Sequence, residues 1–515
     1  MVATTQPLAA MSGLRVLMNG GNAIDAAVAT AATLTVVEPM STGIGGDLFA
    51  LVRMGSEKKI RALNASGRSA AAADAEELRL QNLTEIPSQS AYAVTVPGTI
   101  SGWQELINCY GNMGLNEVLS SAIEYADNGY PVSEVISMQW KLNASRLSQD
   151  ALKSDLLING RSPNPGEIVY MPQLAQILRT ISEGGSEAFY KGNIANQISN
   201  HVQSKGGWLS KQDFATHKPD WVDPIKTVYR GVTCWECPPN GQGLNALIAL
   251  NILSGFDIQS MGFQSAETFH HLIEAMRLAL MDGSLYIADP NMANIPLEKL
   301  LSDDHADLKR SFINPESVSN IDVPVVPNLI NDTVYISVVD KDGNACSLIN
   351  SLFESFGTGI VVPETSIALH NRGKSFSLNE NHPNFLQPKK RPFHTIIPAM
   401  ATINDELWLT YGVMGGMQQA QGHLQILVNL IDFKLSPQQT LDAPRFRTSI
   451  TNESFLETIA QNEILTKLQE KGHNITFAEP HPSFFGSGQI IETNLANGTL
   501  IGASEPRADG MAVAW

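Results

Sequence analysis

The chain has 515 residues, of which 43% are hydrophobic and 17% charged, and its net charge is −17. This length is enough for a large core in one domain or several, and the composition excludes wholesale disorder. The acidic balance argues against general nucleic-acid binding, and it says nothing about the substrate.

The start of the chain shows no targeting signal. The N-terminus lacks a basic segment followed by an apolar run, so no signal peptide is expected. The most apolar stretch, Ala23 to Pro39, is interrupted by Asp25 and Glu38 and is too short to span a bilayer. We therefore expect a cytoplasmic protein without a membrane partner.

Helical periodicity dominates the first half of the chain. Residues 7–38 predict two helices separated by Gly20-Gly21-Asn22. Gly43-Ile44-Gly45-Gly46-Asp47 is a glycine-rich turn without the lysine of a phosphate loop, so close backbone packing is favoured over nucleotide binding. Further helices are predicted over residues 100–109, 115–128, 132–149, 172–182, 193–204, 244–253, 266–286 and 418–432.

Strands alternate with these helices. They are predicted within 220–236 and over residues 48–53, 60–66, 333–340, 345–352 and 398–412. The pattern indicates a layered α/β architecture. Cys234 and Cys237 form a C-x-x-C at a strand end, where buried strand cysteines are favoured over a redox or zinc motif. Residues 303–330 have weak periodicity and predict an exposed linker.

This linker leads to a strand that begins with a threonine. Alternating apolar residues follow Thr333, and the turn Lys341-Asp342-Gly343 predicts a hairpin with a three-residue loop. Folding the hairpin about Asp342 places Ser351 beside Thr333. If the chain were cut before Thr333, that residue would hold a hydroxyl nucleophile and a free α-amine together, as in threonine amidohydrolases.

Ordered motifs along nearly the whole chain identify a resemblance to the gamma-glutamyltranspeptidase family of N-terminal-nucleophile hydrolases. The matching segments, in family order, are 20–26, 43–47, 96–99, 238–243, 337–344, 356–359, 390–392 and 415–416.

The resemblance implies a four-layer αββα sandwich made as a precursor. The implied cut lies between Asp332 and Thr333, and it gives a large-subunit segment, 1–332, and a small-subunit segment, 333–515, intertwined in one domain. It also implies a γ-glutamyl-enzyme ester that water or an amino acid resolves. No cofactor is expected, no residue spacing suggests a metal site, and the chain could form a homodimer.

The resemblance implies roles for individual residues. Thr333 matches the nucleophile, and Ser351 matches the hydroxyl that supports its amine. Gly415 and Gly416 match the pair whose backbone amides form the oxyanion hole. Arg68 matches the arginine that grips the substrate carboxylate with two hydrogen bonds.

The departures from the family gather around the substrate. Phe353 replaces an expected asparagine, and Arg372 and Ser375 stand where the groups that hold a glutamyl α-amine align. His394 and Thr395 replace a serine pair. We expect His394 either to face the substrate beside Thr395 or to be a buried core histidine.

A further departure is that the segment 376–392 is too short for the lid loop of bacterial relatives, which favours hydrolysis over transfer.

Three hypotheses remain open from the sequence. The first is a γ-glutamyl hydrolase and transferase acting on amides such as glutathione. The second is an amidase or acylase of the same chemistry that acts on other carboxylate-terminated amides, such as glutaryl amides. The third is an unprocessed protein that keeps the fold as a binding module.

Overall fold

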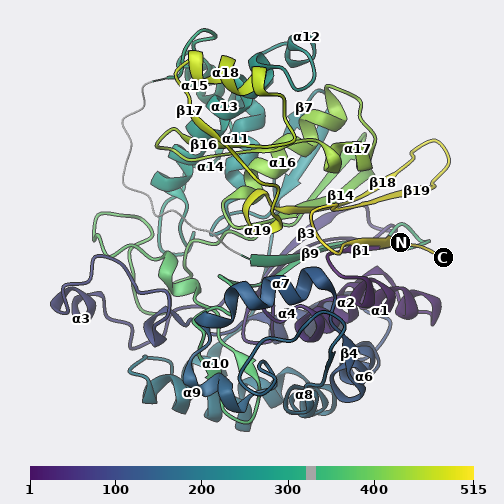
Figure 1. Cartoon of the computed structure of the whole chain (residues 1–515), viewed down its shortest axis with the longest axis vertical. Coiled ribbons are helices and arrows are strands. Elements are labelled where there is room, and N and C mark those ends of the chain that lie inside the picture. Colours follow the sequence, from purple (N-terminus) through teal and green to yellow (C-terminus); the bar gives the residue numbers. More distant parts are fainter. Residues whose placement is uncertain (320–331) are drawn as a thin grey trace.

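Two antiparallel sheets lie face to face in the middle of the molecule (Figure 1), in a computed structural model that describes residues 1–319 and 332–515. The first sheet has the order β20 (Met511–Val513), β1 (Val2–Thr4), β9 (Asp332–Val339), β10 (Ala345–Phe353), β2 (Asp47–Arg53), β3 (Ile60–Asn64) and β6 (Asp220–Val222). The second has the order β19 (Leu500–Ser504), β18 (Ser487–Thr493), β14 (Glu406–Met414), β13 (Ala399–Ile403), β8 (Val232–Glu236) and β7 (Ile225–Tyr229).

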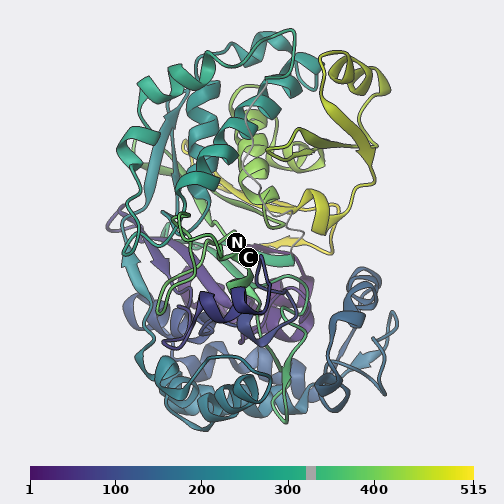
Figure 2. The same cartoon turned by 90° about the vertical axis from the view of Figure 1, so that its left-hand side faces the viewer.

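Helices cover the outer face of each sheet (Figures 1 and 2). The layer outside the first sheet contains α1 (Pro7–Met18), α2 (Ala23–Val37), α4 (Thr99–Tyr110), α5 (Leu115–Val118), α6 (Ser120–Asn128), α7 (Glu134–Asn143), α8 (Pro172–Tyr190), α9 (Asn193–Ser204) and α10 (Lys211–Thr216). The layer outside the second contains α11 (Gly243–Leu253), α13 (Ala266–Tyr286), α15 (Asp303–Arg310), α16 (Gln418–Ile431), α17 (Pro437–Asp442) and α18 (Asn462–Glu470).

The remaining helices and strands are shorter or belong to smaller sheets. They are α3 (Ala75–Leu80), α12 (Ile258–Met261), α14 (Leu297–Leu300), α19 (Pro482–Phe485), the pairs β4 (Tyr130–Pro131) with β5 (Ile168–Val169) and β11 (Val361–Val362) with β12 (Ile367–Ala368), and the three strands β15 (Phe446–Thr448), β16 (Glu453–Glu457) and β17 (Asn474–Ala478). Among the described residues, no helix has the length and apolar character needed to cross a membrane.

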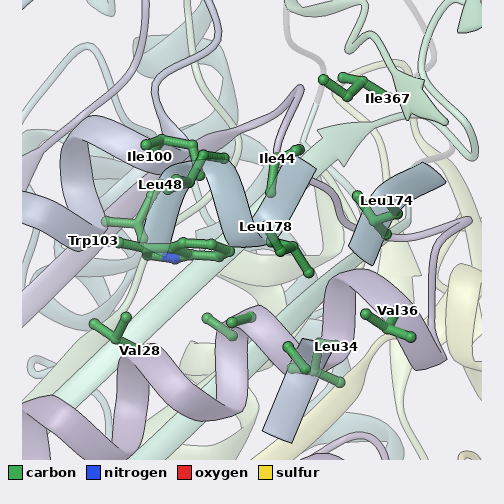
Figure 3. Close-up of a cluster of buried hydrophobic side chains, with 14 of the residues drawn as sticks. Val28, Leu34, Val36, Ile44, Leu48, Ile100, Trp103, Leu174, Leu178 and Ile367 are labelled. Carbon is green, nitrogen blue, oxygen red and sulfur yellow. The ribbon is translucent and has the colours of Figure 1, made fainter. Parts of the chain in front are cut away.

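Three apolar cores hold the layers together. The first lies between α2 and the first sheet, where every residue of this alanine-rich helix is buried. Figure 3 shows part of it: Trp103 of α4 lies between Val28 of α2 and Leu48 of β2. The second core joins the other helical layer to the other sheet, and the third lies between the sheets. Together they confirm the predicted four-layer αββα sandwich.

Several predicted boundaries are wrong. Residues 303–310 form helix α15, so the predicted linker begins too early, and its part over 320–331 lies outside the described residues. The predicted strand 398–412 is a hairpin, β13 and β14. The predicted helix 115–128 is divided into α5 and α6 at Leu119.

Three other bounds move by two to eight residues. The helix predicted from 172 continues to Tyr190, and β3 ends at Asn64. The helix predicted over 132–149 is α7, which ends at Asn143. Cys234 lies in β8 and is buried, as the strand interpretation predicted.

Candidate active site

Thr333 lies at the second residue of β9, in the middle of the first sheet. The antiparallel pairing of β9 with β10 places Val338 opposite Cys346, as the hairpin predicted. Thr333 Oγ1 and Ser351 Oγ are 3.0 Å apart, and both side chains are buried. The structure therefore brings together the two hydroxyls that the sequence placed side by side.

The end of β10 departs from regular pairing directly after Ser351. The register shifts between Asn350 and Phe353, and Phe353 has a φ of 79°. The Phe353 backbone N–H donates to Ser351 Oγ over 2.8 Å. This bulge fixes the Ser351 hydroxyl and turns the chain out of the sheet beside the start of β9.

Gly415 and Gly416 form the connection between β14 and α16. Their φ values of 125° and 61° belong to the left-handed region that favours glycine. The Gln242 side-chain amide donates to the carbonyl oxygens of Gly416 and Thr395, each over 2.7 Å. These two bonds tie the glycine pair to the segment before β13 that carries Thr395. The pair lies where α16 begins, an end of the helix that favours negative charge, and the oxyanion role stays a prediction.

Asp47 is a buried carboxylate that sequence reasoning missed. It begins β2, where it pairs with Ser351 of β10, so both side chains point from the same sheet face. Its carboxylate accepts from the Gly67 and Gly98 backbone N–H groups over 3.0 and 3.2 Å and from His394 Nε2 over 3.1 Å. Thr333, Ser351 and Asp47 thus form a polar row across three adjacent strands.

Two neutral histidines flank Asp47. Burial, and then the Arg372 charge, lower the pKa of His394 to about 3. The Ile396 backbone N–H donates to Nδ1 of His394, so Nε2 carries the proton given to Asp47. Burial also lowers the pKa of His370, whose Nε2 lies 2.9 Å from the Thr95 carbonyl oxygen. His370 is a second site residue that the sequence did not single out.

Asp47 stays ionised despite its burial. Burial opposes ionisation, but His370, the hydrogen bond from His394 and the Arg372 charge together hold the pKa of Asp47 well below its ordinary value. The only sequence signal for this role was an acid at the first position of an apolar strand. Its partners lie in distant parts of the chain, so the signal alone identifies no role.

Arg372 is a fully buried cation in the same cluster. Its guanidinium stacks on Phe353, 3.9 Å from the ring centroid, and Nη1 donates to Thr395 Oγ1 over 2.9 Å. Nε and Nη2 have no hydrogen-bond partner among the described residues. Burial lowers the pKa of Arg372 to about 9, so the group remains charged at neutral pH. Two buried donors are therefore available to an acceptor.

Arg68 and Ser375 lie differently from Arg372. Arg68 is partly exposed, and its Nη2 lies 3.2 Å from Asp220, a carboxylate that also binds Arg391. Ser375 ends the short turn Arg372–Ser375 and lines a separate cavity. Both substrate-binding roles stay predictions. Among residues 1–319 and 332–515, no group of three or more potential ligands could hold a metal ion.

Comparison with known proteins identifies the family of the chain. The model of the family "Gamma-glutamyltranspeptidase" matches residues 9–515. The chain belongs to the gamma-glutamyltranspeptidase family. Members of this family are hydrolase and transferase enzymes, and the chain is such an enzyme with the fold of N-terminal-nucleophile hydrolases.

Relatives within the gamma-glutamyltranspeptidase family carry different names. The glutathione hydrolase-like YwrD proenzyme of Bacillus subtilis (strain 168) is 35% identical over 520 residues, covering 100% of this chain and 98% of its own. The acylase ACY 1 proenzyme of Pseudomonas sp. (strain SE83) is 32% identical over 528 residues, covering 100% and 93%. The crystal structure of cephalosporin acylase from Bacillus halodurans superposes with a TM-score of 0.93 and 42% identity, covering 100% and 95%. Membership of the family therefore identifies the type of reaction but not the substrate.

Proposed function

We propose that the chain cuts itself between Asp332 and Thr333 and then hydrolyses amides whose acyl group ends in a carboxylate and lacks an α-amine. The buried Arg372 is the observation that carries this choice. Its two unpartnered nitrogens can bind a carboxylate with two hydrogen bonds, a geometry in which guanidinium groups are strong binders.

The charges around Arg372 support an anionic acyl group. Asp47 is already bonded to two backbone amides and His394. Glu354, the other nearby acid, binds Arg146 over 2.6 Å and Lys374 over 2.8 Å. These groups carry one more positive than negative charge, so a substrate carboxylate would neutralise the cluster. A buried ammonium would instead add charge without an acid to receive it, which is costly.

The proposed reaction uses the Thr333 hydroxyl twice. First, Oγ1 attacks the Asp332 carbonyl carbon, and the peptide nitrogen leaves as the α-amine while the acyl group moves to oxygen. Water hydrolyses this ester and frees Thr333. The new amine, with an ordinary pKa of about 7.7–8.0, then accepts the Oγ1 proton as the hydroxyl attacks the substrate carbonyl.

The remaining steps consume one water per amide. The backbone amides of Gly415 and Gly416 would donate to the oxyanion of the tetrahedral intermediate. The amine passes its proton to the leaving nitrogen as the C–N bond breaks, which leaves an ester on Thr333. Water attacks that ester and gives its proton to the amine, which passes a proton to Thr333 Oγ1 as the ester C–O bond breaks and the carboxylic acid departs. The Ser351 hydroxyl, 3.0 Å from Thr333 Oγ1, would position the nucleophile.

A γ-glutamyl hydrolase and transferase is the second candidate. Arg68 matches the family's carboxylate-gripping arginine, and the relative that is 35% identical is named glutathione hydrolase-like. Assays with γ-glutamyl and glutaryl p-nitroanilides separate the two functions. We expect the glutaryl compound to be turned over at least as well, and a clear preference for the γ-glutamyl compound would overturn the first proposal.

Processing is tested on the full chain. We expect the freshly purified wild type to give two fragments on denaturing electrophoresis, and mass spectrometry to find Thr333 at the new N-terminus. Thr333→Ala should remain a single chain of 55.8 kDa without amidase activity. A wild type that stays at 55.8 kDa and is inactive would support the unprocessed binding module instead.

A further inference from the structure

A cavity of about 390 Å³ opens beside the candidate active site, and no step described above uses it. Its wall combines Leu280 of α13 and Asn245 of α11 with Ser375, Phe393 and Met417. This volume falls in the range of pockets that enclose drug-sized ligands. Space of this size next to a reaction centre suggests a place for part of the substrate.

Two residues of the cavity wall are direct neighbours in sequence of residues at the reaction centre. Met417 directly follows the glycine pair, and Phe393 directly precedes His394 and Thr395. Asn384 holds the two walls together: its side chain accepts from the Phe393 N–H over 3.0 Å and donates to the Ser375 carbonyl oxygen over 2.6 Å.

The cavity is also distinct from the arginine cluster. Arg372, Arg68 and Asp47 do not line it. If these groups hold the acyl half of the substrate, the amine half is the part left to occupy the cavity.

The wall of the cavity is mainly apolar and includes Leu280, Ile287 and Ile450. Two of the polar residues that line it have a side-chain oxygen without a partner among the described residues, Asn245 Oδ1 and Ser375 Oγ. Both oxygens are covered by protein atoms, so the apolar part of the wall is what a ligand would contact.

The charged and titratable side chains of the wall are already paired or hydrogen-bonded, or they are exposed to solvent. Lys374 is paired with Glu354 over 2.8 Å. His382 Nε2 lies 2.9 Å from the Ser284 carbonyl oxygen, and its Nδ1 accepts from the Asn384 N–H. Glu85 is an exposed residue. The interior therefore favours a neutral group over an ion.

We propose that this cavity is the leaving-group subsite, and that it selects amides of ring-bearing, largely apolar amines. The inference rests on the proposed amide hydrolysis and adds the class of amine to it. Apolar rings would contact Leu280, Phe393 and Met417.

The test compares two glutaryl amides, those of methylamine and of 2-naphthylmethylamine. Both release an alkylamine, so the chemical step is closely matched and the ring is the main difference. We expect kcat/KM for the naphthylmethyl amide to be at least about tenfold higher in the processed wild type. Ser377→Phe should place a ring inside the cavity and reduce this preference while leaving the methylamide rate unchanged.

Ser377→Ala is the matched control, because it changes the same position without closing the cavity. Ser377 lines the cavity and has no role in the proposed chemistry. Ser284→Phe closes the cavity from α13 and serves as the second variant if Ser377→Phe does not fold. An equal preference in wild type and filled variant would overturn the subsite.

A binding experiment separates this proposal from the acyl proposal. N-acetyl-2-naphthylmethylamine is neutral and lacks the glutaryl carboxylate, so its affinity does not depend on Arg372. We expect saturable binding to the wild type, seen by naphthyl fluorescence, and roughly tenfold weaker binding to Ser377→Phe. If neither glutaryl amide is cleaved, the acyl proposal fails, but the binding experiment still tests the subsite. Equal affinities of wild type and Ser377→Phe for this compound would reject the subsite.

Discussion

Arg372 carries a full charge into a part of the protein from which water is excluded. Among the described residues it makes one side-chain hydrogen bond, to Thr395, and one stacking contact, to Phe353. A buried charge with so few partners contributes little to folding stability, because its desolvation costs free energy. A ligand that supplies the missing acceptors explains its presence better. Substituting Arg372 therefore distinguishes a ligand-binding role from a structural role.

We expect Arg372→Met to separate these two roles. Hydrogen bonds to charged groups contribute about 1.5–3 kcal/mol, so KM for a glutaryl amide should rise roughly ten- to hundredfold. Tm should not fall, because methionine fills similar space without desolvating a charge. Steady-state kinetics and thermal unfolding provide the two measurements.

Arg68→Met is the comparison for that variant. Arg68 already binds Asp220 and is partly exposed, so we expect a smaller rise in KM. The opposite order, with Arg68→Met the more damaging for the glutaryl amide, would move the carboxylate site to Arg68.

The sequence predicted the hydroxyl pair of this site, and the resemblance singled out Arg372, but Asp47 was missed. Thr333 and Ser351 belong to one hairpin, so a local turn at Gly343 was enough to place them together. Asp47 receives hydrogen bonds from residues 67, 98 and 394, which the fold brings to it from distant parts of the chain. No local pattern contains that information, and the resemblance supplied none for Asp47.

At the scale of elements, the turn before β2 packs closely against the sheet that contains Thr333. Gly46 approaches β10 so closely that a Cβ there would lie 2.4 Å from the Ser351 carbonyl oxygen. Its own carbonyl oxygen accepts from the Gly98 and Thr99 N–H groups over 2.8 and 3.0 Å. The glycine-rich motif therefore acts on the position of Ser351 through backbone packing.

Gly46→Ala should displace β10 at Ser351. Overpacking of this kind costs about 1–3 kcal/mol, so we expect a lower Tm and a slower appearance of the two fragments. Gly43→Ala is the matched control in the same motif, because its Cβ would meet Leu352 at an ordinary 3.5 Å. Time courses by denaturing electrophoresis measure processing. Equal behaviour of the two variants would show that this contact does not control the site.

Elements with strong local signals were predicted closely. The predicted helices 193–204 and 266–286 coincide with α9 and α13. The hairpin of β13 and β14 was missed although Asn404-Asp405 has two positive φ values, the signature of a tight two-residue turn. Strand β1 has three residues, too few for a period, and depends on pairing with β9 and β20.

At the scale of the whole molecule, buried histidines make stability depend on pH. Burial lowers the pKa of His217 and His394 to about 3 and that of His473 to about 4, and it lowers the pKa of His270, His271 and His370 as well. In the unfolded chain these groups bind protons near pH 6.5, whereas in the folded protein they do not. The free energy of unfolding should therefore fall as pH falls below 6.5.

Other groups add to or oppose this dependence. Asp47, with its lowered pKa, contributes stability above its unfolded pKa near 3.9 and loses it at more acidic pH, below the histidine window. Glu236 and Asp155 have pKa values raised by burial, so their contribution to stability grows as pH falls. A difference between wild type and one histidine variant cancels these shared contributions.

His473 is the best single site for that difference. Its Nε2 lies 2.7 Å from His270 Nδ1, and His270 Nε2 lies 2.8 Å from the Asn314 carbonyl oxygen. Because that carbonyl only accepts, His270 donates through Nε2 and accepts from His473 through Nδ1. The groups that also act on His473 are Glu274, Arg277 and Lys471.

We expect His473→Gln to flatten the acid side of the stability profile. Glutamine keeps an N–H donor for His270 but takes up no proton, so the variant lacks the penalty that the wild type incurs between pH 6.5 and about 4. From pH 7 to pH 5 the wild type should lose about 2 kcal/mol more than the variant, which corresponds to a Tm difference of about 2 °C for a chain of this size. Thermal unfolding at both pH values measures it, with the fragments' integrity checked by electrophoresis. Parallel Tm profiles for wild type and variant would mean that His473 titrates alike in the folded and unfolded states.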